Sequence, residues 1–232
     1  MKATGPEKQK QIRAIVFDLD RTLCVNDTFK VYIWIRLRKN FGQFLKVVPI
    51  LYWALLCFGL GRINNSELKA RTLNLICRGV SCKEAILDRE KLIRDLKWDQ
   101  QILEIIDCCK KQGTLIVLAT ASPNIYTNGI QKKFGFDYLI STELERNEVG
   151  EWTGSLIGAN CFGVEKARHI KNWALDSQIP LSEIGFVSDS HADLPTFVLF
   201  GFSFTVRPTS GLRSNDYYPC IYHLDALIDF LK

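Results

Sequence analysis

The chain has 232 residues, of which 47% are hydrophobic and 24% are charged. These values are typical of a folded globular protein with one domain or one core and an insert, and they exclude a fibrous or wholly disordered chain. The net charge of +5 is uneven, because 28–66 contains six basic and no acidic residues, which leaves 24 basic against 25 acidic residues elsewhere.

The first ten residues, Met1–Lys10, are polar, and we expect them to be disordered and to carry no secretory signal, because they lack an apolar stretch. The eight cysteines form no Cys-x-x-Cys pair. They are therefore predicted to be buried free thiols in a reducing compartment, which favours the cytoplasm. With only three scattered histidines, a structural zinc site is not expected.

The first predicted element is a buried parallel strand at Ile12–Phe17, a short run that is apolar except for Arg13. From Phe29 to about Leu96 the pattern is helical. A helix at Gln100–Lys111 is expected to end before Gly113. The later elements are expected in this order: strand Leu115–Ala119, a helix to about Lys133, strand Tyr138–Ile140, hairpin Glu151–Ile157, helix Glu165–Asp176, and strands Ile184–Val187, Phe202–Val206 and Cys220–Tyr222.

Alternation of strands and helices predicts an α/β fold, a doubly wound (Rossmann-like) and mostly parallel sheet. The long helical stretch after the first strand predicts an inserted cap. We therefore expect a core made of 1–26 and 100–232 and a helical cap made of 27–99.

Polar side chains follow several of these strands. Asp18 and Asp20 lie at the end of the first strand and point the same way if the strand continues, because strand side chains alternate. By itself this pair is equally well explained as a turn that follows a strand. The other polar residues near strand ends or the following helices are Thr120, Ser122, Lys166, Asp189 and Asp193.

These groups converge on one crevice if the sheet is parallel, since ligands bind at the carboxyl ends of its strands. Several carboxylates there require a cation, and oxygen ligands around a phosphate suit Mg²⁺. A hydroxyl and an ammonium complete a phosphate site. The alternatives are an ion-paired Lys166, capping of the next helix by Thr120 and Ser122, an Asp193 that orients Lys166, and a surface role for His191.

The whole set of motifs resembles the haloacid dehalogenase (HAD) superfamily of aspartate-nucleophile phosphatases. The matching segments are Phe17–Thr22, Leu118–Pro123, Cys161–Lys166 and Ser188–Pro195, with Arg21 where glycine is commoner. The resemblance implies that Asp18 attacks phosphorus and that Asp20 protonates the leaving oxygen and then activates water. It also implies a set of binding residues: Thr120 and Lys166, with Ser122 as a weaker candidate, hold the phosphoryl oxygens, and Asp18, the Asp20 carbonyl, Asp189 and Asp193 bind Mg²⁺.

Asp27 stands nine residues after Asp18, at the start of the cap. In the phosphoserine phosphatase-like branch of the superfamily (subfamily IB), an acidic residue at that offset faces the substrate. The alternative is that Asp27 caps the helix that begins near Thr28.

The cap contains fifteen uncharged residues, Val47–Gly61, between Lys46 and Arg62. A spanning helix needs about 20 apolar residues. Basic side chains beside aromatic and aliphatic ones suit contact of 28–66 with a membrane surface. The alternative is a buried cap helix, and whether 44–60 spans, lies on or avoids a membrane stays open. The apolar density argues against a nucleic-acid partner.

A narrower resemblance is to the bacterial phosphatidylglycerophosphatase C group, through Asp27–Phe29, Gly59–Arg62, Cys161–Lys166 and Val206–Pro208. It implies a Mg²⁺-dependent phosphomonoester hydrolase that acts through an aspartyl-phosphate on a membrane lipid phosphate, at the cytoplasmic face of the inner membrane. The alternative is a soluble phosphatase of a small, phosphoserine-like metabolite. A third interpretation is a non-catalytic binding or scaffold protein on the same fold.

Overall fold

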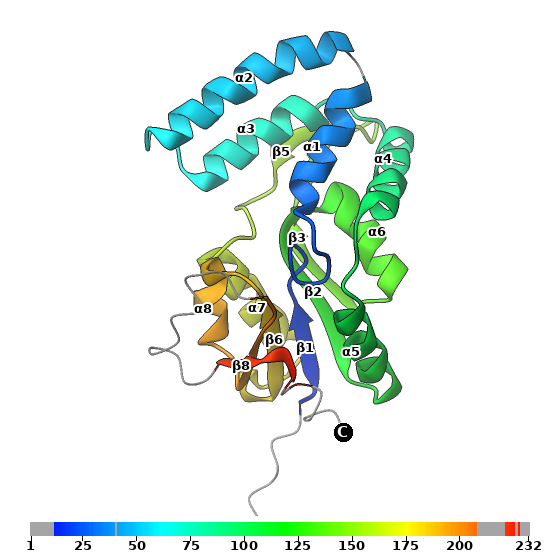
Figure 1. Ribbon diagram of the computed structural model, residues 1–232, viewed down its shortest axis with the longest axis vertical. Helices are drawn as coiled ribbons and strands as arrows, with labels where there is room; N and C mark the ends of the chain where they lie inside the picture. The colour runs from blue at the N-terminus through cyan, green and yellow to red at the C-terminus, as the bar shows by residue number, and fades with distance from the viewer. Residues whose placement is uncertain (1–11, 40, 208–220, 226, 228–232) are drawn as a thin grey trace, which may run out of the picture.

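The computed structural model describes residues 12–39, 41–207, 221–225 and 227, and the predicted disorder of Met1–Lys10 lies outside them. Within these residues, a six-stranded sheet has the order β3-β2-β1-β6-β7-β8 (Figure 1). Every neighbouring pair is parallel. The strands are β1 (Ala14–Phe17), β2 (Leu115–Pro123), β3 (Tyr138–Thr142), β6 (Ile184–Ser188), β7 (Phe202–Thr205) and β8 (Ile221–His223).

Helices cover both faces of this sheet. Ile15 and Phe17 of β1 pack in one apolar cluster with residues of α5 (Gln100–Lys111) and α6 (Asn124–Phe134). Ala14 and Val16 point to the opposite face and pack with α7 (Val164–Asp176) and α8 (Leu194–Phe197). Burial on both faces explains why the strands appear in the sequence as continuous apolar runs. The predicted α/β class is confirmed, with a parallel sheet and a helical insert after the first strand.

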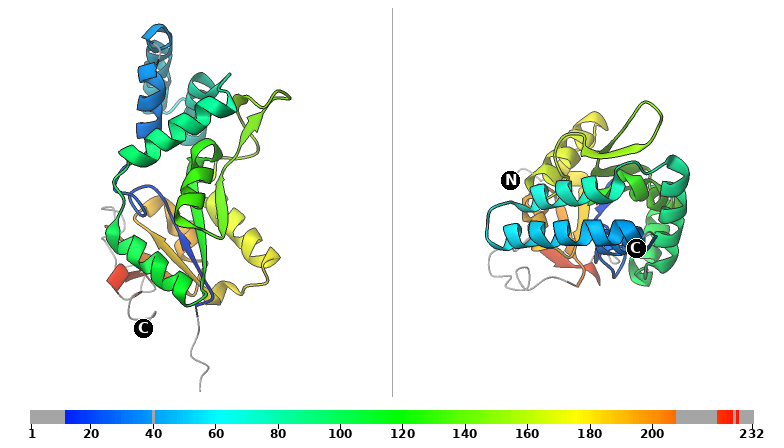
Figure 2. Two further views of the ribbon diagram at one scale, coloured as in Figure 1. Left: turned by 90° about the vertical axis from the view of Figure 1, so that its right-hand side faces the viewer. Right: turned by 90° about the horizontal axis from the view of Figure 1, so that it is seen from above.

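The insert consists of α1 (Thr28–Lys39), α2 (Phe41–Gly59), α3 (Asn65–Cys77) and α4 (Cys82–Asp95). It lies beyond the carboxyl ends of the strands, with α2 farthest from the sheet (Figures 1 and 2). Asn64 and Glu67 form a capping box at the start of α3. No helix in the described ranges is long and apolar enough to cross a bilayer.

A buried arginine ties three of the cap helices together. The Arg36 side chain of α1 donates to the carbonyl of Ile76 at 3.0 Å and to Asp88 at 2.9 Å, and it also pairs with Glu84. Because an unpaired charge would be costly at this depth, the carboxylates of α4 are what permit a basic residue inside the cap.

A hairpin from the second half of the chain also packs on the cap. It is formed by β4 (Leu144–Arg146) and β5 (Trp152–Leu156), and Gly154 lies against α3. A Cβ at Gly154 would stand 2.7 Å from the Cα of Asn74, and its φ is +79°. Only glycine fits there. One apolar cluster runs through both regions, for example through Phe17 and Tyr32, and the division of core from cap at 27 and 99 stays a prediction.

Candidate active site

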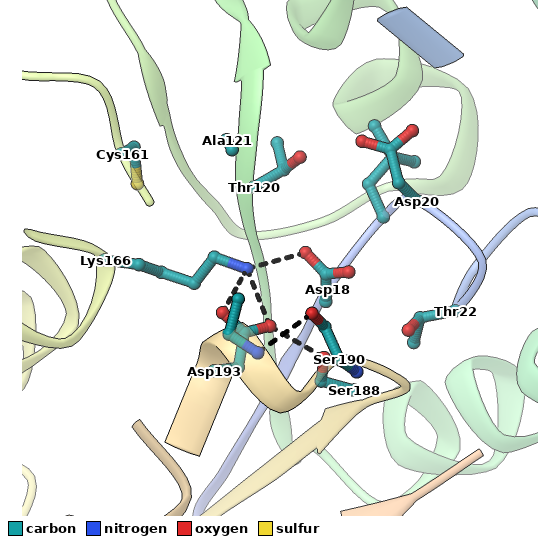
Figure 3. Close-up of polar contacts among 12 residues, drawn as sticks. Asp18, Asp20, Thr22, Thr120, Ala121, Cys161, Lys166, Ser188, Ser190 and Asp193 are labelled. Carbon is teal, nitrogen blue, oxygen red and sulfur yellow. Dashed lines mark hydrogen bonds and ion pairs between the residues drawn. The ribbon is translucent and has the colours of Figure 1, made fainter. Parts of the chain in front are cut away.

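The crevice at the carboxyl ends of the strands holds a buried lysine between two carboxylates (Figure 3). Lys166 Nζ on α7 donates to Asp18 Oδ1 at 2.8 Å and to Asp193 Oδ2 at 2.9 Å. The exposed fractions of Asp18, Lys166 and Asp193 are 5%, 3% and 2%. The charges therefore interact at contact distance and away from bulk water, where each charge-assisted hydrogen bond is strong.

The pKa values of this cluster follow from burial and pairing. Burial raises the pKa of Asp18 to about 8, although Lys166 beside it acts to lower it. Burial acts to lower the pKa of Lys166, but the carboxylates of Asp18 and Asp193 outweigh it and raise that pKa above its ordinary value. Lys166 is thus a fixed positive charge beside the Asp18 oxygens.

A serine at the end of β6 fixes the position of the Asp193 carboxylate. Ser188 Oγ, at the end of β6, donates to Asp193 Oδ2 at 2.7 Å and accepts from the backbone N–H of Ser190 at 3.2 Å. The Asp193 carboxylate therefore orients Lys166, as the alternative interpretation expected, and a contact of Asp193 with metal stays a prediction.

Asp20 engages the cap rather than Asp18. Its Oδ1 accepts from the backbone N–H of Thr28, the first residue of α1, at 2.5 Å, and its Oδ2 accepts from Ser122 Oγ at 2.8 Å. The hydroxyls of Ser122 and Tyr126 lie 2.9 and 3.1 Å from Thr28 Oγ1. Burial raises the pKa of Asp20, and the hydrogen bonds from Thr28 and Ser122 act against this. A raised pKa favours the protonated carboxyl, which is the form that a general acid needs.

Thr120 and Ser122 lie in an irregular part of β2. The pairing with β3 shifts register between Ala119 and Pro123, and bulges of this kind often re-aim side chains next to active sites. Thr120 is fully buried, and its Oγ1 accepts from the backbone N–H of Ser122 at 3.0 Å. Ser122 instead directs its hydroxyl to Asp20, so contact of both residues with phosphate stays a prediction.

The carboxylate of Asp189 fits a cation. Asp189 follows β6, is 4% exposed, and has no hydrogen bond or ion pair from another side chain of the described residues to its carboxylate. Burial raises its pKa to about 6. An unpaired buried carboxylate is unfavourable, and a metal ion would relieve it. Asp18 and the Asp20 carbonyl stay the predicted further oxygen donors.

No three His, Cys, Asp or Glu side chains of the described chain are close enough to hold a metal by themselves. Mg²⁺ is usually held by only one or two carboxylates, with water and substrate phosphate completing its ligands. The donor set at Asp18 and Asp189 fits this ion, with the remaining ligands left to water and phosphate.

The cap contributes a lysine that the sequence did not single out. Lys69 Nζ, on α3, donates to the carbonyl of Ala121 on β2 and lies 5.3 Å from the centre of the Phe29 ring. Burial lowers the pKa of Lys69 to about 8, although Asp20 nearby acts to raise it. In the sequence Lys69 is one of several basic residues on an amphipathic helix, and only the docking of the cap reveals its position.

Three further residues have clear local roles. Asp27 caps α1, since its Oδ1 accepts from the backbone N–H of Lys30 at 3.1 Å; contact with a substrate stays a prediction. Arg21 has a φ of 59°, in the left-handed region, which explains why glycine is commoner there. His191 is exposed, in a short 3₁₀ turn after β6.

Comparison with known proteins places this geometry in a family. Residues 15–197 match the model of the haloacid dehalogenase-like hydrolases. The phosphoserine phosphatase SerB1 of Mycobacterium tuberculosis is 27% identical over 222 residues, which cover 91% of this chain and 71% of the relative.

Two solved structures share the fold. A Bordetella pertussis Tohama I protein of unknown function has a TM-score of 0.77 at 24% identity, over 88% of this chain and 94% of its own. A substrate-bound phosphoserine phosphatase has a TM-score of 0.66 at 20% identity, over 97% of this chain and 100% of its own. The chain belongs to the haloacid dehalogenase-like hydrolases, in their phosphoserine phosphatase-like branch, and is an enzyme of the HAD phosphatase type.

Proposed function

We propose that the chain hydrolyses a phosphomonoester through an aspartyl-phosphate on Asp18, with Mg²⁺ as cofactor. The observation that carries this proposal is the buried contact of Lys166 with both Asp18 and Asp193, with the buried carboxylate of Asp189 within electrostatic reach of both Lys166 and Asp193. A structural ion pair needs only one carboxylate for each lysine. The surplus of buried negative charge indicates a site that binds a cation and a phosphoryl group.

In the first half of the reaction, an Asp18 oxygen attacks phosphorus and the bond from phosphorus to the leaving oxygen breaks. Lys166 acts to lower the pKa of Asp18 against the effect of burial, and it pairs with the phosphoryl oxygens, to which Thr120 donates. The leaving oxygen takes a proton from Asp20. Asp18 and Asp189 would hold Mg²⁺, which would supply positive charge to offset these carboxylates and the phosphoryl group.

In the second half, Asp20 removes a proton from water, which attacks phosphorus and releases Asp18 and inorganic phosphate. Asp20 must leave Thr28 and Ser122 for either proton transfer, because both of its oxygens are engaged there. Movement of α1 with the rest of the cap is the simplest way to release it, and closure of the cap also excludes water.

The favoured substrate is a small, charged phosphomonoester. Lys69 and Asp27 bring one positive and one negative charge from the cap to within electrostatic reach of Asp20, the proposed proton donor to the leaving group, and Asp27 also pairs with Lys30 at 3.2 Å. The charges of Lys69 and Asp27 suit a leaving group that carries both an ammonium and a carboxylate, as phosphoserine does. The similarity to a relative named as a phosphoserine phosphatase also supports this substrate class.

A second candidate is a lipid phosphate such as phosphatidylglycerophosphate, hydrolysed at the cytoplasmic face of the inner membrane. The specific observation in its favour is the run of exposed apolar side chains on α2, which include Tyr52 and Trp53. The comparisons give no support for this substrate, and the small metabolite is preferred.

A phosphate-release assay tests these proposals. Soluble phosphomonoesters, phosphoserine among them, are compared with phosphatidylglycerophosphate in detergent, each with Mg²⁺ and with EDTA. We expect Mg²⁺-dependent turnover that Asp18→Asn abolishes and that Asp107→Asn, an exposed control on α5, leaves unchanged. Equal turnover by Asp18→Asn would refute the mechanism, and activity on the lipid alone would refute the preferred substrate.

A further inference from the structure

From Leu45 onward, the described solvent-facing side chains of α2 are apolar. Eight of the 19 exposed large hydrophobic side chains of the described residues lie between Leu45 and Leu60. The outer face of α2 is defined here by side chains that repeat at helical spacing: Leu45, Pro49, Tyr52, Trp53, Leu56 and Leu60. Their exposure reaches 69% at Tyr52 and 58% at Trp53. These residues lie on one side of the helix because the interval between them is three or four residues.

An ordinary surface helix buries its large apolar side chains, whereas α2 exposes many of them. The side of α2 that is buried holds Val47, Ala54 and Cys57, of which Ala54 and Cys57 pack with Ile63 near the start of α3. The larger and more aromatic side chains point outward, at the end of the molecule farthest from the sheet (Figures 1 and 2). A contiguous exposed apolar face of this kind marks an interaction surface.

The charge around this face identifies the partner. Arg38 at the end of α1 and Arg62 just after α2 are both exposed, so a positive side chain stands near each end of the helix. Arg38 also lies 4.3 Å from the ring centre of the exposed Trp34. Since 28–66 contains no acidic residue, nothing there offsets these charges, and the complementary surface is anionic.

An anionic lipid bilayer fits this pattern better than a second copy of the chain. A symmetric contact between two outer faces would bring arginines together without acidic partners, which is unfavourable. At the bilayer surface the same arginines meet phosphate groups, while tyrosine and tryptophan rings favour the boundary between headgroups and acyl chains.

We propose that the outer face of α2 docks the enzyme on the surface of an anionic bilayer, with the helix axis in the membrane plane. The face from Leu45 to Leu60 makes a contact about 22 Å long at 1.5 Å per residue. The carboxyl ends of the strands, where the site residues lie, are on the sheet side of the cap, and α2 is on its far side (Figure 1). The docking is independent of the substrate.

Vesicle flotation with the full chain tests this proposal. Wild type is expected to float with phosphatidylcholine vesicles that contain phosphatidylglycerol, and much less with phosphatidylcholine alone or at high salt. Tyr52→Glu and Leu56→Glu are each expected to weaken partitioning by roughly tenfold, because each removes an apolar side chain from the contact and adds a negative charge. Leu175→Glu, on the exposed surface of α7, is the matched control and is expected to float like wild type.

Two further measurements make the result decisive. Thermal unfolding and turnover of p-nitrophenyl phosphate are expected to be unchanged in both α2 variants, since the substituted side chains are solvent-exposed. Failure of wild type to float, equal flotation of Leu56→Glu, or a concentration-dependent dimer that Leu56→Glu dissociates would each overturn the proposal. Absent phosphatase activity would count against the proposed function only.

Discussion

Replacement of Lys166 by methionine tests the central ion cluster. Methionine has nearly the same length but no charge, so Lys166→Met leaves the carboxylates of Asp18 and Asp193 buried without their shared cation. Both lie within 2.9 Å of Nζ, and neither is more than 5% exposed. Loss of one partner from a buried pair typically costs about 3–5 kcal/mol.

We therefore expect Lys166→Met to lower the free energy of unfolding by about 3 kcal/mol at pH 8, in EDTA. The loss should shrink at pH 5, because burial already raises the pKa of Asp18 to about 8 and removal of Lys166 raises it further. Below that pKa the carboxyl is neutral and its burial costs less.

The assay is urea denaturation at both pH values, with Lys171→Met on the exposed side of α7 as the matched control. The control is expected to stay within about 0.5 kcal/mol of wild type. Adding Asp193→Asn to Lys166→Met should recover part of the loss, since one unpaired charge is removed. Equal stability of Lys166→Met and Lys171→Met would refute the reasoning.

Three further predictions follow from the site and its supports. The pKa of Asp189 is raised from 3.8 to about 6, so its contribution to metal-free stability is present below pH 4 and is lost as pH rises through 6. Asp189→Asn should therefore be more stable than wild type at pH 7 in EDTA, by about 2 kcal/mol in the free energy of unfolding measured with urea. Added Mg²⁺ should no longer stabilise this variant. Lower stability of the variant would contradict the prediction. Gly154→Ala should lower the free energy of unfolding by more than about 1 kcal/mol, and with it the midpoint of thermal unfolding, because its Cβ would meet Asn74 in a backbone with positive φ. An unchanged midpoint would show that α3 can shift away from the hairpin at no cost. Arg21→Gly should stabilise the chain in urea by up to about 1 kcal/mol, since relief of the left-handed φ outweighs the added chain entropy; a marked loss would mean that the Arg21 side chain holds the loop.

The arrangement of the fold was largely predictable because both faces of the sheet are covered. Ile12–Phe17 is apolar except for Arg13, and Leu115–Ala119 is apolar throughout. The structure has β1 and β2 in these segments, although β1 starts at Ala14, after Arg13, and β2 continues to Pro123. The first strand of the hairpin, Leu144–Arg146, was missed, because three residues with two charges carry no apolar pattern.

The site was only partly predictable, for a different reason. The polar residues at the carboxyl ends of parallel strands must meet, so Asp18, Lys166 and Asp193 could be expected in one crevice. The contacts of Asp20 with Thr28 and of Lys69 with Ala121 depend on how the cap docks. Docking is a tertiary property that leaves no local signal in the sequence. For the same reason, the sequence could not show that the apolar side chains of α2 face solvent rather than the rest of the cap.

The most direct test of the account is to locate the phosphoryl group on the enzyme. Enzyme and substrate are mixed with Mg²⁺, quenched in acid during steady turnover, digested and mapped by mass spectrometry. We predict one phosphoryl group on the peptide that contains Asp18 and none in Asp18→Asn. A phosphoryl group on another residue, or turnover with an unmodified Asp18 peptide at every quench time, would contradict the account.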